Sequence, residues 1–411
     1  MENRITPSKR ILVVCQHFWP ESFRINDLCE GFVEYGLEVD VLCGEPNYPK
    51  GEWFDGYGPF KRRHEIYQGI HIYRTFEIKR GNNSNFRIFI NYMTFPFASV
   101  FHVPGLLRNQ YDKVFIYSLS PVYMGIAGIM IGRLQKAEII TYVMDLWPEN
   151  LYSVLNFKNR FIRKVLMMSS TWFYKKSNKL ICLSNHAIDV LKGRTGKPDK
   201  NFCFIPQCCE KIYETPINDE ELKMRFGSGF NVVYAGNISP AQDFPTIIQA
   251  AEQLKREGYH INWIIVGDGM SRQEVQKTVQ KFDLSDSFFF EGFKPVEDIP
   301  KYAAIASCLV ACLVKSPLLD CTIPAKVMSY IASGRPIVLA MDGEANSLIN
   351  ESGCGLACSS GDSVGLAENI KKIYALSDEK RVEMGERGRR LHFENFGWDV
   401  NLEKLLNFIF S

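Results

Sequence analysis

The segment Thr322–Val338, with the sequence TIPAKVMSYIASGRPIV, places a lysine at a predicted helix start. The threonine and proline predict an N-terminal cap, and Gly334 suits a left-handed C-terminal cap. Backbone N–H groups at a helix N-terminus carry partial positive charge and bind phosphate. Lys326 adds a full charge in the first turn. The segment indicates a phosphate site, although an ordinary helix with a surface lysine fits it equally well.

Two short glycine turns are further candidates. Gly236 in AGNIS and Gly267 in GDG each follow an apolar run that predicts a strand. A glycine there would let the backbone approach a ligand closely, but a plain strand-to-helix turn explains each motif as well. The sequence lacks GxGxxG, which disfavours a nicotinamide or flavin enzyme, and it also lacks Walker A, HExxH and GxSxG.

The elements that must position these residues alternate along the whole chain. A length of 411 residues exceeds one ordinary core and predicts two domains, 1–205 and 206–411. Apolar runs alternating with amphipathic helices predict an α/β fold with parallel sheets. The predicted strands are Ile11–Cys15, Glu38–Cys43, Lys113–Ser118, Glu138–Val143, Leu180–Leu183, Phe202–Ile205, Asn231–Ala235, Ile261–Val266, Ser287–Phe290, Cys308–Leu313 and Pro336–Ala340.

Charge divides unevenly between the halves. Residues 1–205 hold 27 Lys and Arg against 18 Asp and Glu, whereas residues 206–411 hold 21 against 28. A basic half suggests an anionic partner such as a membrane surface, a lipid phosphate or a nucleic acid. The predicted helix Phe157–Lys179 has seven cations and no acids, so it could lie on anionic lipid or simply cover the core. The acidic second half and the absence of a known module disfavour nucleic acid.

The remaining composition indicates a cytosolic protein. Twelve cysteines without a CxxC pair favour reduced, mostly buried thiols. The polar start MENRITPSKR is not typical of a signal peptide. The apolar stretch Phe86–Leu107 is interrupted by Arg87, Asn91 and two prolines, which argues against a membrane span. An interfacial helix or a domain face both remain open for it.

Several longer motifs together resemble one family. The first half carries FWPESFRIND, EPNYPKGEWFDGYG and DLWPEN, and the second carries VVYAGNISPAQDF, IIVGDG, FFFEGFKP and TIPAKVMSYIASGRPI. With them the chain resembles family 4 glycosyltransferases, specifically the bacterial O-antigen and capsule branch that includes L-N-acetylfucosamine transferases. The resemblance implies the GT-B fold, with two doubly wound Rossmann-like domains facing across a cleft. It places the acceptor on 1–205 and the nucleotide sugar on 206–411, with the last helices, about 393–411, as candidates for crossing back.

The resemblance also implies the reaction. Such enzymes move a sugar from a nucleotide donor, commonly UDP-linked, with retention of configuration and without a catalytic metal or cofactor. The implied acceptor is a polyprenyl-diphosphate-linked saccharide in surface polysaccharide assembly. The implied location is cytoplasmic and peripheral, at the anionic inner face of the cell membrane. Cations, backbone N–H groups and a helix dipole must then stabilise the leaving diphosphate.

The implied site draws on both domains. Lys326 and Arg24 are expected to contact the diphosphate, with Arg335 as a substitute cation. Glu21 and Asp145 are expected near the reacting sugar or acceptor hydroxyl, although Glu21 and Arg24 could pair locally and Asp145 could cap a turn. The expected catalytic residues are Glu21, Asp145 and Lys326, and the expected donor-binding residues are Arg24, Gly236, Asn237, Gly267, Phe293, Lys294, Ser329 and Arg335.

Departures from the family pattern keep two alternatives open. Cys321 and Ser329 stand at the positions of two family glutamates, Asn237 and Gln242 replace an arginine and a lysine, and Met144 replaces a histidine. Ser329 is then the candidate for holding the ribose. A nucleotide-sugar 2-epimerase would share the fold, but the sparse carboxylates disfavour it. The missing glutamates would also suit a non-catalytic partner subunit.

Overall fold

The computed structural model describes residues 9–81, 84–154, 159–215, 217–227, 229–316 and 319–411. These divide into two compact units. The first runs to Leu183 and also takes in Ala187–Phe204 and Leu405–Ser411. The second consists of Ser184–His186 and Ile205–Lys404. The last helix, α16 (Trp398–Phe410), therefore begins in the second unit and ends in the first.

The described part of the first unit contains an eight-stranded sheet in the order β3-β4-β2-β1-β5-β6-β7-β8. All neighbours are parallel except β3 and β4, which form an antiparallel hairpin. Without β3, the order reverses at β1 as in a doubly wound fold. The strands are β1 (Arg10–Val14), β2 (Glu38–Cys43), β3 (His64–Tyr67), β4 (Ile70–Arg74), β5 (Lys113–Ser118), β6 (Glu138–Val143), β7 (Lys179–Cys182) and β8 (Phe202–Phe204).

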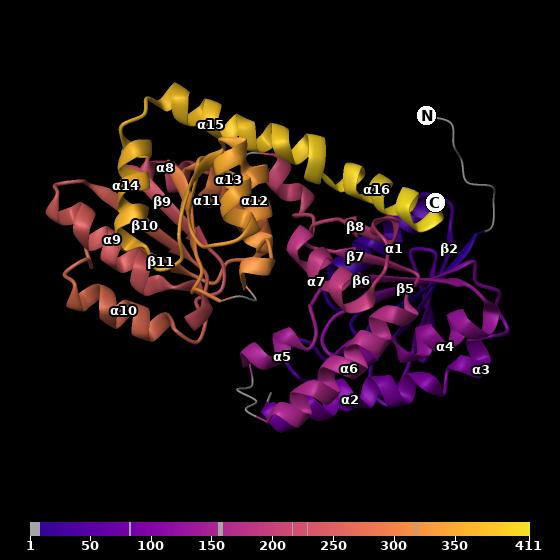
Figure 1. Ribbon diagram of the computed structural model, residues 1–411. Helices are drawn as coiled ribbons and strands as arrows, with labels where there is room; N and C mark the ends of the chain where they lie inside the picture. The colour runs from indigo at the N-terminus through magenta and orange to yellow at the C-terminus, as the bar shows by residue number, and fades with distance from the viewer. Residues whose placement is uncertain (1–8, 82–83, 155–158, 216, 228, 317–318) are drawn as a thin grey trace. The chain divides into compact units, whose positions relative to one another are not determined.

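Helices cover the faces of this sheet because its central strands are buried on both sides. Helices α2, α4 and α6 lie together on one face, and each contacts the short turn η1 (Figure 1). The helical segments of this unit are α1 (Arg24–Glu34), α2 (Asn85–Val100), α3 (Val103–Leu106), η1 (Val122–Gly125), α4 (Ile126–Gln135), α5 (Glu149–Val154), α6 (Arg160–Lys176), α7 (Asn185–Thr195) and η2 (Asp199–Asn201).

The second unit repeats the plan in a cleaner form. Its described strands form an all-parallel sheet of six in the order β11-β10-β9-β12-β13-β14, which is the Rossmann order. The order reverses between β9 and β12, so a crevice is expected at their carboxyl ends. The strands are β9 (Phe230–Ala235), β10 (Ile261–Val266), β11 (Phe288–Gly292), β12 (Cys308–Cys312), β13 (Ile337–Ala340) and β14 (Gly355–Cys358).

Helices α9, α10 and α14 pack on one face of this sheet, and α11, α12 and α13 lie on the other (Figure 1). The helical segments are η3 (Lys211–Glu214), α8 (Glu220–Phe226), η4 (Pro240–Gln242), α9 (Phe244–Arg256), α10 (Arg272–Lys281), η5 (Val296–Asp298), α11 (Ile299–Ala304), η6 (Leu319–Cys321), α12 (Ala325–Ser333), α13 (Glu344–Ser352), α14 (Ser363–Tyr374), α15 (Asp378–Leu391), the π-helical turn η7 (His392–Phe396) and α16.

The sequence-predicted strands are confirmed to within a residue or two at their ends, but three strands were missed. The hairpin strands β3 and β4 are short, and β3 alternates exposed with half-buried residues, so neither forms an apolar run. Strand β14 has only four residues and begins at a glycine. Short edge strands of this kind lack the buried pattern that makes the central strands recognisable.

Two predicted helices need correction. The basic helix expected over Phe157–Lys179 is α6, which covers Arg160–Lys176, and Phe157 and Lys158 lie outside the described residues. The stretch Phe86–Leu107 is divided between α2 and α3. Among the described residues, no helix is both long and apolar enough to span a bilayer.

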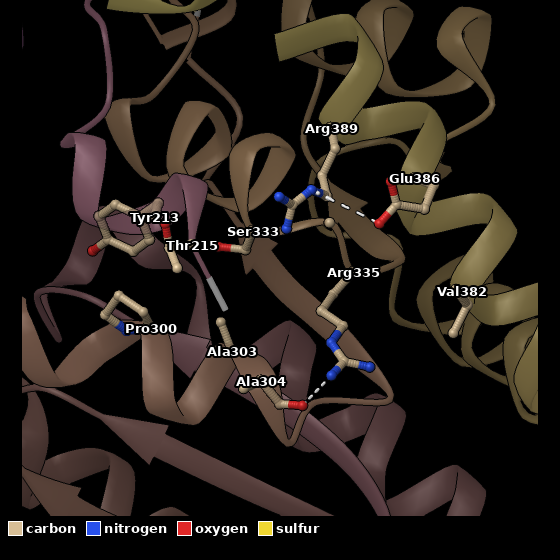
Figure 2. Close-up of a pocket in the computed structure, with 11 residues that line it drawn as sticks. Tyr213, Thr215, Pro300, Ala303, Ala304, Ser333, Arg335, Val382, Glu386 and Arg389 are labelled. Carbon is tan, nitrogen blue, oxygen red and sulfur yellow. Dashed lines mark hydrogen bonds and ion pairs between the residues drawn. The ribbon is translucent and has the colours of Figure 1, made fainter. Parts of the chain in front are cut away.

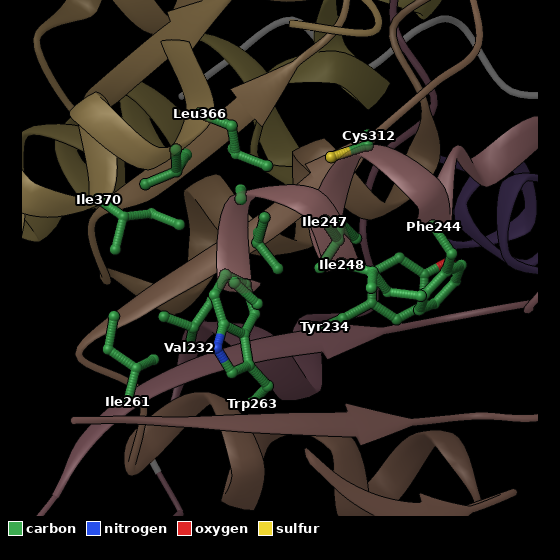
Figure 3. Close-up of a cluster of buried hydrophobic side chains, with 14 of the residues drawn as sticks. Val232, Tyr234, Phe244, Ile247, Ile248, Ile261, Trp263, Cys312, Leu366 and Ile370 are labelled. Carbon is green, nitrogen blue, oxygen red and sulfur yellow. The ribbon is translucent and has the colours of Figure 1, made fainter. Parts of the chain in front are cut away.

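The core of the second unit centres on Trp263 of β10, which is 2% exposed and stacks on Phe288 at 5.6 Å between ring centroids (Figure 3). Trp263→Ala is expected to lower the free energy of unfolding of this unit by about 3–5 kcal/mol, because it leaves a cavity among rigid neighbours. Guanidinium unfolding of the full chain measures the change. Trp172→Ala, at a 45% exposed position on α6, is the matched control and should cost no more than about 0.5 kcal/mol. Equal effects of the two changes would contradict this account of the core.

Candidate functional site

The residues of the predicted phosphate site lie at the carboxyl edge of the second sheet. Strand β9 ends at Ala235 and β12 at Cys312, on either side of the point where the strand order reverses. Helix α12 packs over this region, and the phenol of Tyr330 on α12 accepts a hydrogen bond from the Ala235 amide at 2.9 Å. The contact fixes α12 against the end of β9, so a ligand in the crevice would meet the first turn of the helix.

Lys326, in the first turn of α12, is the central cation of this edge. Its Nζ donates to the Tyr234 hydroxyl at 2.8 Å and to the Gln242 side-chain oxygen, and it lies 4.2 Å from the centroid of the Tyr234 ring. In the described part of the chain no carboxylate forms an ion pair with it. Burial lowers the pKa of Lys326 to about 7, because the charged form loses hydration that these neutral partners do not replace.

The cap predicted for α12 is half right. Gly334 adopts the left-handed conformation at the C-terminus, with φ +67°, as expected. Thr322 does not cap the helix, because its hydroxyl donates to the Leu319 carbonyl at 3.2 Å and Pro324 occupies the N-cap position. The first turn therefore lacks a side-chain cap, and its positive dipole end faces the edge that holds Lys326.

Two predicted glycines form the floor of the site. Gly236 and Gly267 both have positive φ, at +147° and +138°. A Cβ on Gly236 would lie 2.9 Å from the Lys326 Nζ, and a Cβ on Gly267 would lie 1.9 Å from the Gly236 carbonyl oxygen. The amide of Gly236 donates to the Val266 carbonyl at 2.9 Å, which joins the two turns. Glycine is required at both positions because the loops and the lysine approach so closely.

Asn237 and Ser329 lie beside this floor in different ways. Asn237 is exposed, and its carbonyl accepts a 2.6 Å bond from the Tyr234 hydroxyl. Ser329 is 9% exposed, one turn along α12 from Lys326, and its hydroxyl donates to the Ala325 carbonyl at 3.4 Å. Asn237 is thus open to a ligand, whereas Ser329 would have to exchange an intrahelical bond to reach one.

Phe293 and Lys294 follow Gly292 at the carboxyl end of β11, two strands from β9. Phe293 is 75% exposed. Lys294 is half-buried, with its Nζ 6.0 Å from the centroid of the Tyr302 ring. Both belong to the same edge of the sheet as Gly236, because the strands are parallel.

Arg335 does not join this group. It precedes β13, at the amino edge of the sheet, so the sheet separates it from the carboxyl ends. Its guanidinium donates to the Ala304 carbonyl and lines a separate pocket with Ser333 and Arg389 (Figure 2). Burial there lowers the pKa of Arg335. The prediction of Arg335 as a donor-binding cation is therefore corrected: sequence adjacency to α12 put it close by, but the helix carries the chain to the opposite edge.

In the first unit, the buried carboxylate of Glu21 is hydrogen-bonded to neighbouring loops. It is 1% exposed, and its Oε1 accepts hydrogen bonds from the amides of Asn47 and Tyr48, both at 2.6 Å. Its Oε2 lies 2.8 Å from the Nδ1 of His17. These bonds hold the loop that follows β2 against the loop that follows β1. They satisfy the carboxylate completely, so Glu21 positions these loops.

Arg24 and Asp145 lie nearer the surface of the same unit. Arg24, at the start of α1, forms an ion pair with Asp27 at 3.0 Å. Asp145 accepts a hydrogen bond from the Ser120 amide at 3.2 Å, which links the loops after β5 and β6. Burial is the main cause that raises the pKa of the Tyr117 phenol. The nearby charge of Asp145 raises this pKa further, and that of Arg24 lowers it. Both side chains therefore act on the end of β5, at this sheet's own reversal point.

Sequence reasoning missed Tyr234, whose ring and hydroxyl form most of the seat of Lys326. A tyrosine inside an otherwise aliphatic strand, two residues before Gly236, was the available signal. Gln242 was noted only as a departure from the family, yet its amide oxygen is the second partner of the lysine. The described residues contain no group of three or more His, Cys, Asp or Glu side chains that could hold a metal ion.

A comparison with known families finds a match over most of the second unit. Residues 223–391 match the family described as Glycosyl transferases group 1. The probable glycosyltransferase WbjE of Pseudomonas aeruginosa is 25% identical over 316 residues, which cover 75% of this chain and 76% of that protein. The 2-deoxystreptamine glucosyltransferase of Streptomyces kanamyceticus is 21% identical over 54% of this chain, and the match spans 58% of that relative.

Solved structures agree on the fold over the whole chain. The sucrose-phosphate synthase of Thermosynechococcus elongatus superposes with a TM-score of 0.75 at 15% identity, covering 97% of this chain and 98% of that one. Anabaena Alr3699/HepE, solved with UDP and glucose, gives 0.68 at 15% identity, covering 98% and 99%. The segment that matches this family includes Lys326 and the glycine turns, and the likeness to the solved structures shows that the chain has their GT-B fold of two Rossmann-like units.

Proposed function

We propose that this chain transfers a sugar, with retention of configuration, from a UDP-linked donor to a lipid-linked saccharide in bacterial surface polysaccharide biosynthesis. The observation that carries the proposal is Lys326, a cation without a carboxylate partner among the described residues, at the crevice where a Rossmann-type sheet receives its ligand. An anionic diphosphate would supply the negative counter-charge that the neutral partners of this ammonium do not.

The donor and acceptor classes come from similar proteins. Anabaena HepE was solved with UDP-glucose, and work on trehalose-6-phosphate synthase concerned transfer with retention. Relatives include the putative colanic acid glycosyltransferase WcaI of Escherichia coli and the amylovoran glycosyltransferase AmsK of Erwinia amylovora. A polysaccharide acceptor assembled on a polyprenyl diphosphate fits these names and a peripheral location at the cytoplasmic face of the membrane.

In this reaction the main task of the protein is electrostatic stabilisation of the leaving diphosphate. The bond between the anomeric carbon and the diphosphate oxygen breaks, and its electron pair stays on the diphosphate. The acceptor oxygen bonds to that carbon, and the proton of the acceptor hydroxyl passes to the departing diphosphate oxygen. Lys326 and the first turn of α12 would meet the growing negative charge, stabilising the transition state more than the bound donor. Gly236 and Gly267 let the backbone approach, and Asn237 offers an exposed amide. Arg24 and Asp145 are the proposed contributions of the first unit.

Lys326→Ala is expected to slow turnover by roughly 10²–10³-fold, the cost of losing one such electrostatic group. Folding should change little, since the Tyr234 hydroxyl keeps its bond to the Asn237 carbonyl. Acceptor-dependent transfer from UDP-sugars, measured with purified chain, gives kcat, and a melting curve checks the fold. Lys326→Arg should recover part of the rate.

Lys255→Ala is the matched control, because this lysine lies in the last turn of α9, away from the crevice, and pairs with Asp283. Its kcat should stay at the wild-type value. A well-folded Lys326→Ala variant with near-normal kcat would remove the phosphate role. Donor turnover without any acceptor would instead indicate the epimerase, and no turnover by the wild-type chain alone would indicate a non-catalytic subunit.

Donor affinity should fall as the pH rises. The pKa of Lys326 is lowered to about 7 in the free protein, so the ammonium that binds diphosphate becomes scarcer above that pH. Between pH 7 and 9 the Kd for UDP is expected to rise roughly tenfold per unit, until the pH passes the higher pKa of the complex. Calorimetric titration measures it. Lys326→Arg, which stays charged, should flatten the dependence, and an unchanged slope in that variant would assign the proton to another group.

Helix α6 is the proposed electrostatic contact with anionic lipid. It carries five described cations and no acid, and Phe161, Met168 and Trp172 are exposed along it. The double variant Lys164→Gln/Lys175→Gln is expected to weaken binding to phosphatidylglycerol vesicles at low salt by roughly tenfold or more, at about 1 kcal/mol per cation. Sedimentation with vesicles measures it. Lys223→Gln/Lys255→Gln, in the second unit, is the control, and equal losses in both pairs would show only a general charge effect.

A further inference from the structure

Helix α2 exposes large apolar side chains on its outer side and buries polar side chains on its inner side, unlike an ordinary surface helix. Its inner side buries Asn91 and Ser99 completely beside Phe95. Its outer side exposes Phe89 by 60% and Phe97 by 68% of their areas. A surface helix normally turns its apolar stripe to the core and its polar residues to water. Here the core side combines polar Asn91 and Ser99 with Phe95, while Phe89 and Phe97 face outward.

The exposed rings form a continuous apolar groove with neighbouring loops. Phe60 and Phe76 stack with their centroids 6.3 Å apart, and Phe101 at the end of α2 is 85% exposed. The groove measures about 540 Å³, and the residues that line it carry no charge. They are Phe60, Phe76, Phe89, Ile90, Met93, Thr94, Phe97, Ala98 and Phe101, here called the phenylalanine face. An exposed apolar patch of this kind marks an interaction site.

Exposed cations lie close to the phenylalanine face along the chain. Arg87 and Arg108 are exposed, whereas Lys79 forms an ion pair with Glu52 and Arg80 is buried. Arg63 lies with its guanidinium carbon 5.7 Å from the centroid of the Phe60 ring, and its charge helps to lower the pKa of His102, just beyond Phe101. Cations at the rim of an apolar surface are complementary to anionic headgroups above a hydrocarbon layer.

We propose that the phenylalanine face inserts into the headgroup–acyl boundary of an anionic membrane. Its rings are buried there while Arg63 and its neighbours meet lipid phosphates. Helix α6 packs on the same η1 turn as α2, so its cations are available to the same unit's approach to the bilayer. The inference deepens the proposed membrane location and rests on the proposed function: α6 supplies attraction that salt screens, and the phenylalanine face supplies insertion that salt does not.

The test is vesicle sedimentation of the full chain carrying Phe97→Ser/Phe101→Ser. Vesicles of phosphatidylglycerol and phosphatidylcholine are used at low salt and at about 0.5 M salt, where the Debye length has shrunk to a few ångströms. Wild-type chain is expected to keep measurable binding at high salt. The double variant should lose roughly 100-fold in partition coefficient at both salts, about tenfold for each ring withdrawn from the membrane.

Matched controls separate insertion from unfolding and from general stickiness. Leu134→Ser on α4 and Met224→Ser on α8 remove exposed apolar side chains outside the face, 63% and 82% exposed, and should bind like wild type. Phe97→Trp/Phe101→Trp should restore binding, since large aromatic rings suit the interface. The affinity of the Ser variant for UDP and its melting temperature should match wild type, which makes failure of the donor proposal distinguishable from failure of this one.

Three outcomes would overturn the proposal. Wild-type vesicle binding by the Ser variant would show that the face does not enter the bilayer. Concentration-dependent dimers that vanish in the Ser variant, with no salt-resistant vesicle binding by wild type, would assign the face to a second copy of this chain. Binding that appears only when the vesicles contain polyprenyl phosphate would assign the groove to an acceptor chain.

Discussion

The burial of the Lys326 ammonium among neutral partners is the constraint on which the site depends. The strand order reverses between β9 and β12, where a crevice is expected at the carboxyl ends. There the Lys326 ammonium contacts the ring and hydroxyl of Tyr234 and the side-chain oxygen of Gln242. The cation gains only partial compensation, so its pKa falls to about 7. Because Gly236 lies beneath the ammonium, the backbone there can hold no side chain. The site is therefore arranged around a cation whose hydrogen-bond partners, Tyr234 and Gln242, are neutral.

The two units have similar sheet topologies, but the loops at their carboxyl edges differ in character. In the second unit the carboxyl edge presents glycine turns and a helix start. In the first unit the corresponding loops are joined by a buried polar network in which Glu21 accepts two backbone amides and contacts His17. A carboxylate bonded in this way is a structural anchor, because moving it would leave buried donors unpaired. Arg24 and Asp145 remain at the reversal point of that sheet, close enough to Tyr117 to shift its pKa in opposite directions.

The surface of the first unit exposes large apolar rings and cations. Helix α2 directs phenyl rings outward and buries Asn91 and Ser99, and α6 lines up cations beside exposed Phe161 and Trp172. Exposed rings cost free energy in water, and neighbouring cations repel one another. The proposed contact with an anionic membrane would lower both costs. A soluble domain face would have the opposite polarity, as α9 does, whose buried side is apolar throughout apart from Thr246.

The sequence by itself determined the two α/β halves, the central strands and the cluster of Lys326, Gly236 and Gly267, because buried parallel strands are continuous apolar runs and glycine turns follow them. It could not reveal β3 and β14, whose short, half-exposed strands carry no such pattern. Tertiary structure decided which neighbours in sequence are neighbours in space. Crossing α12 carries the chain from Lys326 to Arg335 at the opposite edge, and the fold alone brings Tyr234 beneath a lysine 92 residues away. Long-range packing also decided that α2 buries Asn91, Phe95 and Ser99 and exposes Phe89 and Phe97, because the burial of a helix depends on which elements pack against it.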